Sequence, residues 1–317
     1  MTRCGSADKL DRMADPAGSV EPSRGPKVYR IEGREFAARP LAPGLYLVAT
    51  PIGNLGDVTL RALETLAAAD LIACEDTRVT ARLLERYGIR TALTPYHDHN
   101  AAAARAKILA RLRDGRTVAL VSDAGTPLVS DPGYRLVRAA QDEGFAVTAV
   151  PGPSAVLAAL AVAGLPTDRF FFEGFLPPKD AARRARIAEL ARVPATLVLF
   201  ETGPRMADAL AALAEGLGDR SATVCRELTK LHEEIRRDTL GALARAYGSD
   251  AETRGEFVLV IAPPQTRAAT AEEIDALLQQ ALRTQSVKDA VGAVAAATGE
   301  PRAQVYRRAL ALTRDSR

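Results

Sequence analysis

Short apolar runs alternate with amphipathic stretches along most of this chain, and the alternation predicts an α/β protein. In the first half, apolar runs of strand length occur at residues 45–49, 70–74, 117–121 and 146–150. Between these runs, leucine and alanine recur at helical spacing, most clearly in the Ala-rich stretch 101–113. Strands that alternate with helices in this way are typical of a mostly parallel sheet.

The second half also alternates predicted strands and helices, but at a different spacing. We expect strands at 169–173, 195–200, 221–226 and 256–261, and helices around 154–163, 179–191, 204–214 and 238–246. Pro263 and Pro264, together with residues 266–270, are typical of a linker. The remaining residues contain no strand candidate, so we expect them to be helical.

These patterns divide the chain into four parts. We expect a disordered tail over 1–41, because this segment is rich in glycine, proline, serine and mixed charge. An N-terminal α/β domain over 42–150 and a C-terminal α/β domain over 151–264 follow. A small helical module over 270–317 ends the chain.

Composition limits the classes of function. Apolar residues make up 47% of the 317 residues, enough for sizeable cores, whereas a 5% aromatic share without tryptophan argues against a broad stacking surface for single-stranded nucleic acid. The formal net charge of +3 means that an RNA partner would have to meet local basic patches.

The three cysteines are scattered, which fits neither a zinc site nor a disulfide framework, and Cys74 and Cys225 are expected to be buried. No apolar run reaches the length of a membrane span. We therefore expect a cytoplasmic protein with neither a metal site nor a membrane partner.

Glycine- and proline-rich turns follow several predicted strands. Ser122–Gly133 and Pro151–Ala155 each come directly after an apolar run, at the kind of position where open α/β sheets bind ligands. Tight connectors without a ligand are the alternative. The turn Thr50–Asp57 lacks both the Gly-x-Gly-x-x-Gly pattern and the Gly-Lys-Ser/Thr of a P-loop. We expect it to shape the floor of a cleft rather than to bind NAD or ATP.

Together these loops resemble the tetrapyrrole methylase superfamily. The resemblance is carried by Thr50–Asp57, Cys74–Arg78, Ser122–Pro127, Ser130–Gly133 and Pro151–Ala155, which come in that family's order. Phe172–Pro177 and Arg226–Lys230 are similar to its ribosomal RNA branch, which methylates the 2′-hydroxyl of a cytidine ribose in the decoding region of small-subunit ribosomal RNA. The resemblance covers residues 44–262, and the helical end resembles that branch's C-terminal module.

The resemblance implies a homodimeric enzyme of two α/β domains that holds S-adenosylmethionine in the cleft between them. Its partner would be small-subunit ribosomal RNA or the assembled small subunit. The residues that correspond to the family's cofactor site are Pro51, Ser122, Asp123, Gly125, Thr126, Pro127, Ser154 and Ala155. The chain departs from the family twice: Glu201–Arg205 lacks the usual histidine, and Tyr96–Asn100 is followed by Ala101 instead of glutamate.

Methyl transfer to a ribose hydroxyl needs in-line alignment and removal of the hydroxyl proton. The candidate proton acceptors on the first-domain loops are Asp57, Glu75, Asp76, Asp123, His97 and His99. We rank Asp76 first, with Glu75 beside it, because Glu-Asp-Thr-Arg follows a strand. The same tetrapeptide could instead cap the next helix.

Basic residues near these loops are candidate contacts to the RNA backbone. We expect Arg78, Arg205 and Lys230, together with His97, to contact the substrate, and Arg226 is a further candidate for a phosphate. Two other functions stay open at this stage. One is a small-molecule methylase that acts on a tetrapyrrole intermediate, and the other is a non-catalytic RNA-binding assembly factor with a vestigial cofactor pocket.

Overall fold

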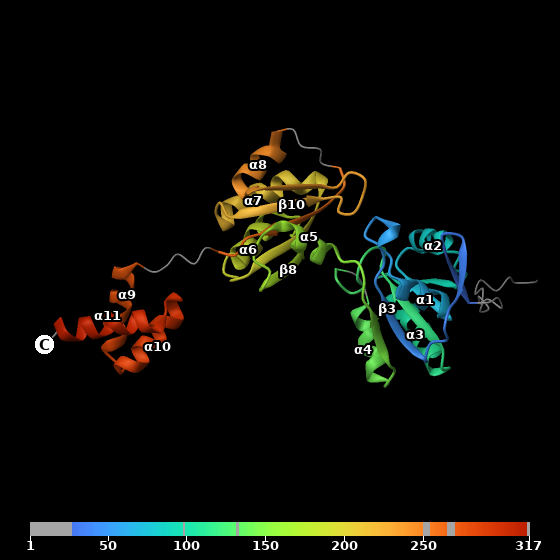
Figure 1. Cartoon of the computed structure of the whole chain (residues 1–317), viewed down its shortest axis with the longest axis horizontal. Coiled ribbons are helices and arrows are strands. Elements are labelled where there is room, and N and C mark those ends of the chain that lie inside the picture. The colour runs from blue at the N-terminus through green and yellow to red at the C-terminus, as the bar shows by residue number, and fades with distance from the viewer. Residues whose placement is uncertain (1–26, 98, 131–132, 250–253, 265–269, 316–317) are drawn as a thin grey trace, which may run out of the picture.

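The computed structural model describes residues 27–97, 99–130, 133–249, 254–264 and 270–315 (Figure 1). Its first sheet has five strands in the order β5-β4-β6-β3-β7, and every neighbouring pair is parallel, as the sequence predicts. The strands are β3 (Gly44–Val48), β4 (Leu71–Cys74), β5 (Leu93–Pro95), β6 (Thr117–Val121) and β7 (Val147–Val150).

Helices cover both faces of this sheet, and together they form the N-terminal domain. They are α1 (Leu60–Ala68), α2 (Thr77–Arg86), α3 (Ala101–Arg113) and α4 (Tyr134–Asp142), with a 3-10 turn, η1, at Leu55–Asp57. One apolar cluster lies under α1 and α2, and a second lies under α3 and α4. Because β6 lies between strands on both sides and helices on both faces, all five of its residues are buried.

The second sheet has the order β11-β10-β12-β9-β8. Only β8 and β9 are parallel, and the other neighbours are antiparallel. The strands are β8 (Phe170–Phe175), β9 (Thr196–Thr202), β10 (Ser221–Arg226), β11 (Glu234–Thr239) and β12 (Glu256–Ile261). Helices α6 (Asp180–Leu190), α7 (Met206–Leu217) and α8 (Leu240–Ser249) pack on one face, and α5 (Ala155–Ala163) packs on the other. A second 3-10 turn, η2 (Gly203–Arg205), follows β9.

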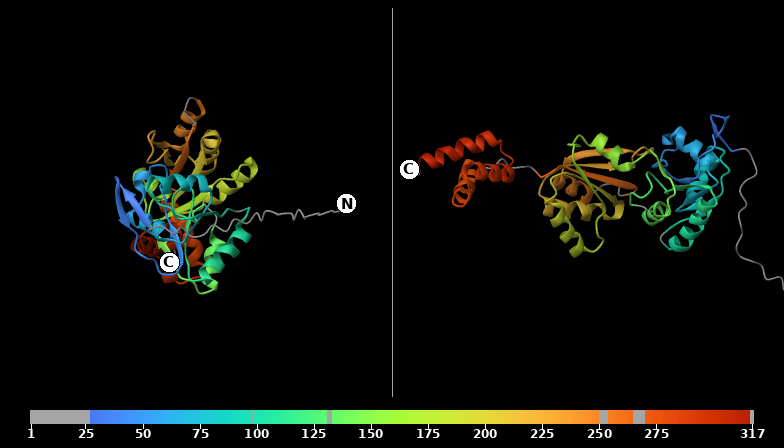
Figure 2. Two further views of the ribbon diagram at one scale, coloured as in Figure 1. Left: turned by 90° about the vertical axis from the view of Figure 1, so that its right-hand side faces the viewer. Right: turned by 90° about the horizontal axis from the view of Figure 1, so that it is seen from below.

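Three helices end the chain, as expected from the lack of a strand candidate there. They are α9 (Ala271–Leu282), α10 (Val287–Thr298) and α11 (Arg302–Asp315), drawn in red in Figures 1 and 2. The helices pack on one another around Ile274, Leu278, Val291, Val294 and Val305. Thr270 and Glu273 form a capping box at the start of α9, and Ser286 caps α10.

The expectation of a disordered segment up to residue 41 is wrong for the part that the structure describes. Strands β1 (Val28–Ile31) and β2 (Arg34–Ala37) form a hairpin, whose turn residues Glu32 and Gly33 both have positive φ. The Tyr29 ring stacks on Phe36, and Tyr29 also packs against the core under α1. Residues 1–26 lie outside the described part.

Helix α1 begins with a side-chain cap. Asp57 lies in η1, and the Thr59 hydroxyl caps α1 by accepting from the Ala62 amide at 3.1 Å. Thr59 directly precedes the first helical residue, which is where a capping hydroxyl can reach the free amides. Residues 131 and 132 lie outside the described residues, and α4 begins at Tyr134.

Asp70 joins three separate segments of the N-terminal domain. One carboxylate oxygen accepts from the amide and the hydroxyl of Thr117, both at 2.9 Å, and the other accepts from Lys27 Nζ at 2.9 Å. Lys27 also donates to the Ala68 carbonyl, at 2.6 Å. Burial acts to raise the pKa of Asp70, but the hydrogen bonds from Thr117 and Lys27 outweigh it and hold the pKa below its usual value.

We expect Asp70→Asn to lower the free energy of unfolding by about 1–3 kcal/mol at neutral pH, because hydrogen bonds to a charged group are lost. A carboxyl group whose pKa is lowered in the folded state stabilises it above the unfolded pKa, and this stability is lost as pH falls through the folded pKa. The difference between the wild type and Asp70→Asn should therefore shrink in acid. Urea unfolding followed by circular dichroism measures both effects.

Asp142→Asn is the matched control, because Asp142 is exposed and lies 4.0 Å from Arg138 in a surface ion pair. Its substitution should change the free energy by about 0.5 kcal/mol or less. An equal effect of the two substitutions, or a difference that grows in acid, would contradict the role given to Asp70.

Candidate active site

Two adjoining cavities lie where loops of the N-terminal domain meet strands of the C-terminal domain. The first cavity has a volume of about 340 Å³ and the second about 360 Å³. Both are lined by Ile52, Asp123, Ala124 and Glu256, so these four residues mark the boundary between them. We call them cavity A (about 340 Å³) and cavity B (about 360 Å³) below.

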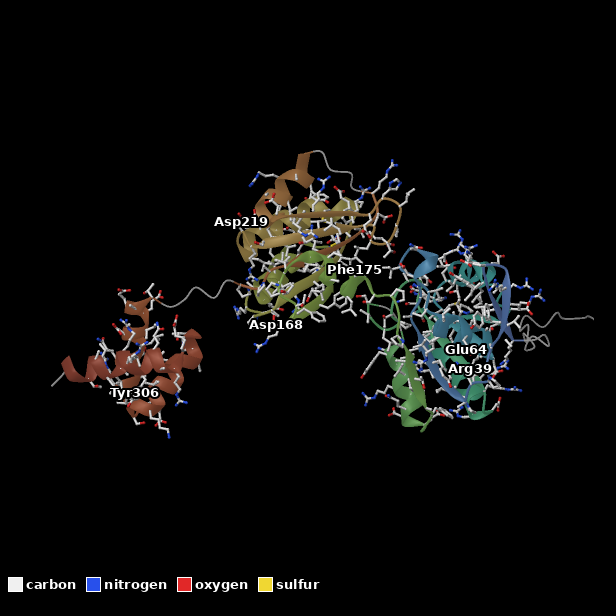
Figure 3. The ribbon with its side chains drawn as sticks, viewed as in Figure 1. Arg39, Glu64, Asp168, Phe175, Asp219 and Tyr306 are labelled. Atoms are coloured by element: carbon white, nitrogen blue, oxygen red, sulfur yellow. The ribbon has the colours of Figure 1, made fainter. Side chains whose placement is uncertain are left out.

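Cavity A has an apolar wall from the C-terminal domain. Phe200, Leu228 and Val258 lie on this wall, and Val156 of α5 adds to it. The Phe200 ring makes edge contacts with the rings of Phe172 and Phe175, with centroids 4.9 Å and 5.7 Å apart. Figure 3 labels Phe175 on the side of the C-terminal domain toward the N-terminal domain. Such a wall suits a flat, apolar ring.

The opposite wall of cavity A is the loop after β6. Thr50 and Gly125 exchange two backbone hydrogen bonds, of 2.9 Å and 3.0 Å, which hold this loop against the loop after β3. Gly125 has φ +80°, and a Cβ there would lie 3.4 Å from Ile52 Cγ2. Thr126 Oγ1 donates to the Pro153 carbonyl at 3.2 Å, so the two glycine- and proline-rich turns lie side by side.

The amino end of α5 also faces cavity A. Ser154 caps the helix by accepting from the Leu157 amide at 3.4 Å, and both Ser154 and Ala155 line the cavity. The free amides and the positive end of the helix dipole favour a bound carboxylate.

Glu201 contributes a buried carboxylate to the lining of cavity A. The residue is 2% exposed, and its Oε1 accepts from the Thr202 amide at 2.8 Å and lies 3.3 Å from Arg205 Nε. Its Oε2 is buried and has no hydrogen-bond partner among the described residues. A buried acceptor without a partner is costly, so this oxygen suits a ligand ammonium or hydroxyl group. The sequence alone assigned no binding role to Glu201, which is an acidic residue near the end of the mostly apolar strand β9.

Cavity B has two cationic side chains in its lining. Its lining includes Pro51, Thr80, Arg82 and Ser122, and Lys230 reaches it from the C-terminal domain. The stem of Lys230 lies over Gly53, where a Cβ would come within 2.5 Å of Lys230 Cγ. The Lys230 ammonium pairs with Glu227 and Glu256, both at 2.9 Å. Burial acts to lower the pKa of Lys230, but these two carboxylates outweigh it and raise the pKa, so the side chain stays charged.

Asp76 caps α2, which is the alternative that its sequence left open. Its Oδ1 accepts from the Arg78 amide at 2.8 Å, and its Oδ2 lies 2.6 Å from Arg78 Nη2. These hydrogen bonds from Arg78 lower the pKa of Asp76 to about 2. The Asp76 amide donates to Asp123 Oδ1 at 2.9 Å, which joins the loop after β4 to the loop after β6.

The structure therefore brings together most of the residues expected at the cofactor site. Asp123, Gly125, Thr126, Ser154 and Ala155 line cavity A, whereas Pro51 and Ser122 line only cavity B. Lys230, which was expected to contact the substrate, also lines cavity B. Pro127 is buried and is not part of either lining. Glu75, Asp76, Arg78, His97 and Arg205 also lie outside both linings.

Arg205 and His97, which lie outside both linings, contact other parts of the chain. Arg205 donates to the Leu176 carbonyl at 2.6 Å and thereby holds the end of β8. The His97 amide donates to Asn100 Oδ1 at 3.0 Å, and the His97 ring lies 6.0 Å from that of His99. Because Pro95 is opposite Cys74 in the sheet, His97 follows its strand at the same edge as Asp76.

The described residues include two buried cysteines, no metal-binding cluster and no helix that could span a membrane. Cys74 and Cys225 are buried, as expected, and burial raises the pKa of each thiol to about 11. Within the described residues, we find no group of three or more His, Cys, Asp and Glu side chains that could hold a metal ion. None of the helices in that part of the chain is both long and apolar enough to cross a membrane.

Comparisons with known protein structures support the fold. A cobalt precorrin-4 methyltransferase aligns with a TM-score of 0.53 at 20% identity, covering 69% of this chain and 94% of that one. A diphthine synthase aligns with a TM-score of 0.52 at 18% identity, covering 69% and 89%. At this identity the likeness concerns the fold alone.

Sequence comparisons show the family. The profile of the tetrapyrrole (corrin/porphyrin) methylases matches residues 44–244, and that of the RsmI C-terminal HTH domain matches residues 268–313. Ribosomal RNA small subunit methyltransferase I of Mesorhizobium japonicum is 53% identical over 279 residues, covering 88% of this chain and 95% of the relative. The Erythrobacter litoralis protein of the same name is 52% identical over 278 residues, covering 88% and 98%. The chain therefore belongs to the tetrapyrrole methylase family, in the group of the ribosomal RNA small subunit methyltransferases I.

Proposed function

We propose that this protein transfers the methyl group of S-adenosylmethionine to the 2′-hydroxyl of a cytidine ribose in the decoding region of 16S ribosomal RNA. The observation that carries the proposal is the pair of cavities that meet at Asp123. One has an aromatic wall and ends at a helix N-terminus, and the other has the cationic side chains of Arg82 and Lys230 in its lining. The names of the relatives support ribosomal RNA of the small subunit as the substrate.

Cavity A suits S-adenosylmethionine. Its volume of about 340 Å³ falls in the range of about 300–1,000 Å³ that ligand pockets occupy. The phenylalanine and valine wall suits the adenine ring, the amino end of α5 suits the carboxylate, and Glu201 Oε2 suits a donor group. When bound, the cofactor would supply an electrophilic methyl group on a positively charged sulfur.

Cavity B and its surroundings suit the RNA. Lys230 and Arg82 bring positive charge to the cavity, and the Arg78 guanidinium is 88% exposed on the same helix as Arg82. We propose Arg78, His97, Arg205 and Lys230 as substrate contacts. Guanidinium and ammonium groups are the usual partners of RNA phosphates.

The helical module also favours RNA over a small-molecule substrate. Helix α11 carries exposed Arg302, Tyr306 (labelled in Figure 3) and Arg307, whereas the acidic Glu272 and Glu273 lie on α9. A basic helix face with an aromatic residue can meet a phosphate backbone and stack on a base. The tetrapyrrole substrate that the sequence left open does not call for such a module.

We also propose that the protein works in the cytoplasm as a homodimer, on free small-subunit RNA or on the assembled subunit. The family to which the chain belongs supports this proposal.

The proposed function predicts that the purified protein transfers labelled methyl groups from S-adenosylmethionine to small subunits, or their RNA, taken from a strain that lacks the endogenous enzyme. Digestion of the product to nucleosides should yield 2′-O-methylcytidine. Label on a base would overturn the ribose assignment. Binding of RNA with neither methyl transfer nor cofactor binding would support the non-catalytic alternative.

We expect Val129→Trp to weaken binding of S-adenosylhomocysteine by about tenfold or more, because an indole would fill part of cavity A. Val129 lines that cavity and is 38% exposed, so the substitution spares the apolar cores. Tyr134→Trp is the control, since Tyr134 is 64% exposed and is not part of the lining. Equal affinities of the two variants in calorimetry would argue against cavity A as the cofactor site.

We expect Arg78→Gln to weaken RNA binding without changing cofactor affinity, and to reduce the salt dependence of RNA binding by about one phosphate contact. Fluorescence anisotropy over a series of salt concentrations measures both. Arg86→Gln is the control, because Arg86 is an exposed residue in the last turn of the same helix. If the two variants show the same salt slope, Arg78 does not contact a phosphate.

A further inference from the structure

We propose that Asp123 is the catalytic residue that takes the proton from the ribose hydroxyl, and that the target nucleoside enters cavity B to meet it. The proposal rests on the function proposed above, because it needs a methyl donor in cavity A. It differs from the expectation that Asp76 takes this proton.

The position of Asp123 is the first argument. Among the four residues that line both cavities, only Asp123 and Glu256 carry a carboxylate. The Glu256 side chain is 79% exposed and pairs with Lys230 at 2.9 Å. Asp123 is half-buried, and within the described part of the chain no ion pair of 4.0 Å or less involves it. A general base that takes the proton of the attacking hydroxyl during methyl transfer must lie where the methyl donor and the nucleophile meet.

The two oxygens of Asp123 have different surroundings. Oδ1 accepts from the Asp76 amide at 2.9 Å, and this backbone hydrogen bond holds the carboxylate in place. Oδ2 accepts no hydrogen bond from another described residue. One oxygen therefore anchors the group, and the other can accept a proton from a ligand hydroxyl.

Asp76 lacks this combination. Both of its oxygens bond to Arg78, its pKa is lowered to about 2, and it lies outside both linings. A carboxylate that binds its proton so weakly is a poor general base. We assign Asp76 a positioning role, in which its side chain caps α2 and its amide orients Asp123.

Cavity B suits one nucleoside. Its volume of about 360 Å³ holds a single unstacked nucleotide rather than a duplex, so the target must leave its stack, as in other enzymes that modify one nucleotide. The lack of a side chain at Gly53 leaves room for Lys230 to lie across the cavity. Arg82 then supplies positive charge for a phosphate beside the nucleoside, and the Lys230 ammonium, whose charge Glu227 and Glu256 balance, can donate a hydrogen bond to another.

The step balances without any further reactant. As the ribose oxygen bonds to the methyl carbon, its proton passes to Asp123, and the carbon–sulfur bond breaks with its electron pair left on sulfur. The sulfonium becomes a neutral thioether, the carboxylate becomes a carboxylic acid, and the proton is then released to water. The net charge of the site is the same before and after the transfer.

Asp123→Asn tests the proposal, because the asparagine side-chain oxygen can still accept from the Asp76 amide while the proton acceptor is lost. We expect the single-turnover rate of methyl transfer to fall by about 100-fold or more. Dissociation constants for S-adenosylhomocysteine, by calorimetry, and for RNA, by anisotropy, should stay within about threefold of the wild type. Circular dichroism checks that the variant is folded.

Asp76→Asn is the comparison variant. Because it keeps the backbone amide that holds Asp123 and changes only the side-chain cap of α2, its rate should fall by less than that of Asp123→Asn. If Asp123→Asn keeps a rate within about fivefold of the wild type, or if Asp76→Asn loses more, the proposal is wrong. A wild-type protein that methylates no RNA would instead overturn the proposed function itself.

Discussion

The backbone pairing of Thr50 with Gly125 is the contact on which the site depends most. It is an isolated two-hydrogen-bond bridge, and it holds the loops after β3 and β6 together at the carboxyl edge of the first sheet. Gly125 can make it because its φ of +80° is open to glycine and costly for other residues. Without this pairing, neither cavity would have its N-terminal wall.

From this pairing, side-chain contacts extend to both domains. Thr50 Oγ1 donates to the Ser122 carbonyl at 3.2 Å, and Thr126 Oγ1 donates to the Pro153 carbonyl. The second contact ties the first domain to the turn that leads into α5. Lys230 adds a contact in the opposite direction, from the C-terminal domain over Gly53. The carboxylates of Glu227 and Glu256 keep the Lys230 ammonium charged next to the cavity.

The sequence predicts the apolar strands well and the polar ones poorly. The bounds of β6, β10 and β12 match: β6 and β12 are mostly continuous apolar runs, and β10 is a short run of small, β-branched and apolar residues between turn residues. Strand β11 was missed because Glu234–Thr239 is mostly charged, and it can be so because it forms the edge of its sheet. The β1–β2 hairpin was missed because its strands have four residues each and lie in a segment of mixed charge.

Likewise, only some of the site residues could be predicted from the sequence. The glycine- and proline-rich turns at strand ends predicted a ligand site, and the resemblance to the family named the expected cofactor residues, most of which line the two cavities. The unpartnered oxygen of Glu201 and the shared position of Asp123 leave none, since both depend on residues far apart in the chain. For Asp76, the sequence was compatible with a cap and with a base, and only the contacts of Arg78 favour the cap.

The central claim is that a methyl donor in cavity A faces a nucleoside in cavity B across Asp123. A crystal structure with S-adenosylhomocysteine tests it most directly. We predict the ligand in cavity A, with its carboxylate at the amino end of α5 and its sulfur at the boundary next to Asp123. A ligand bound elsewhere, or one whose sulfur points away from cavity B, would contradict the claim.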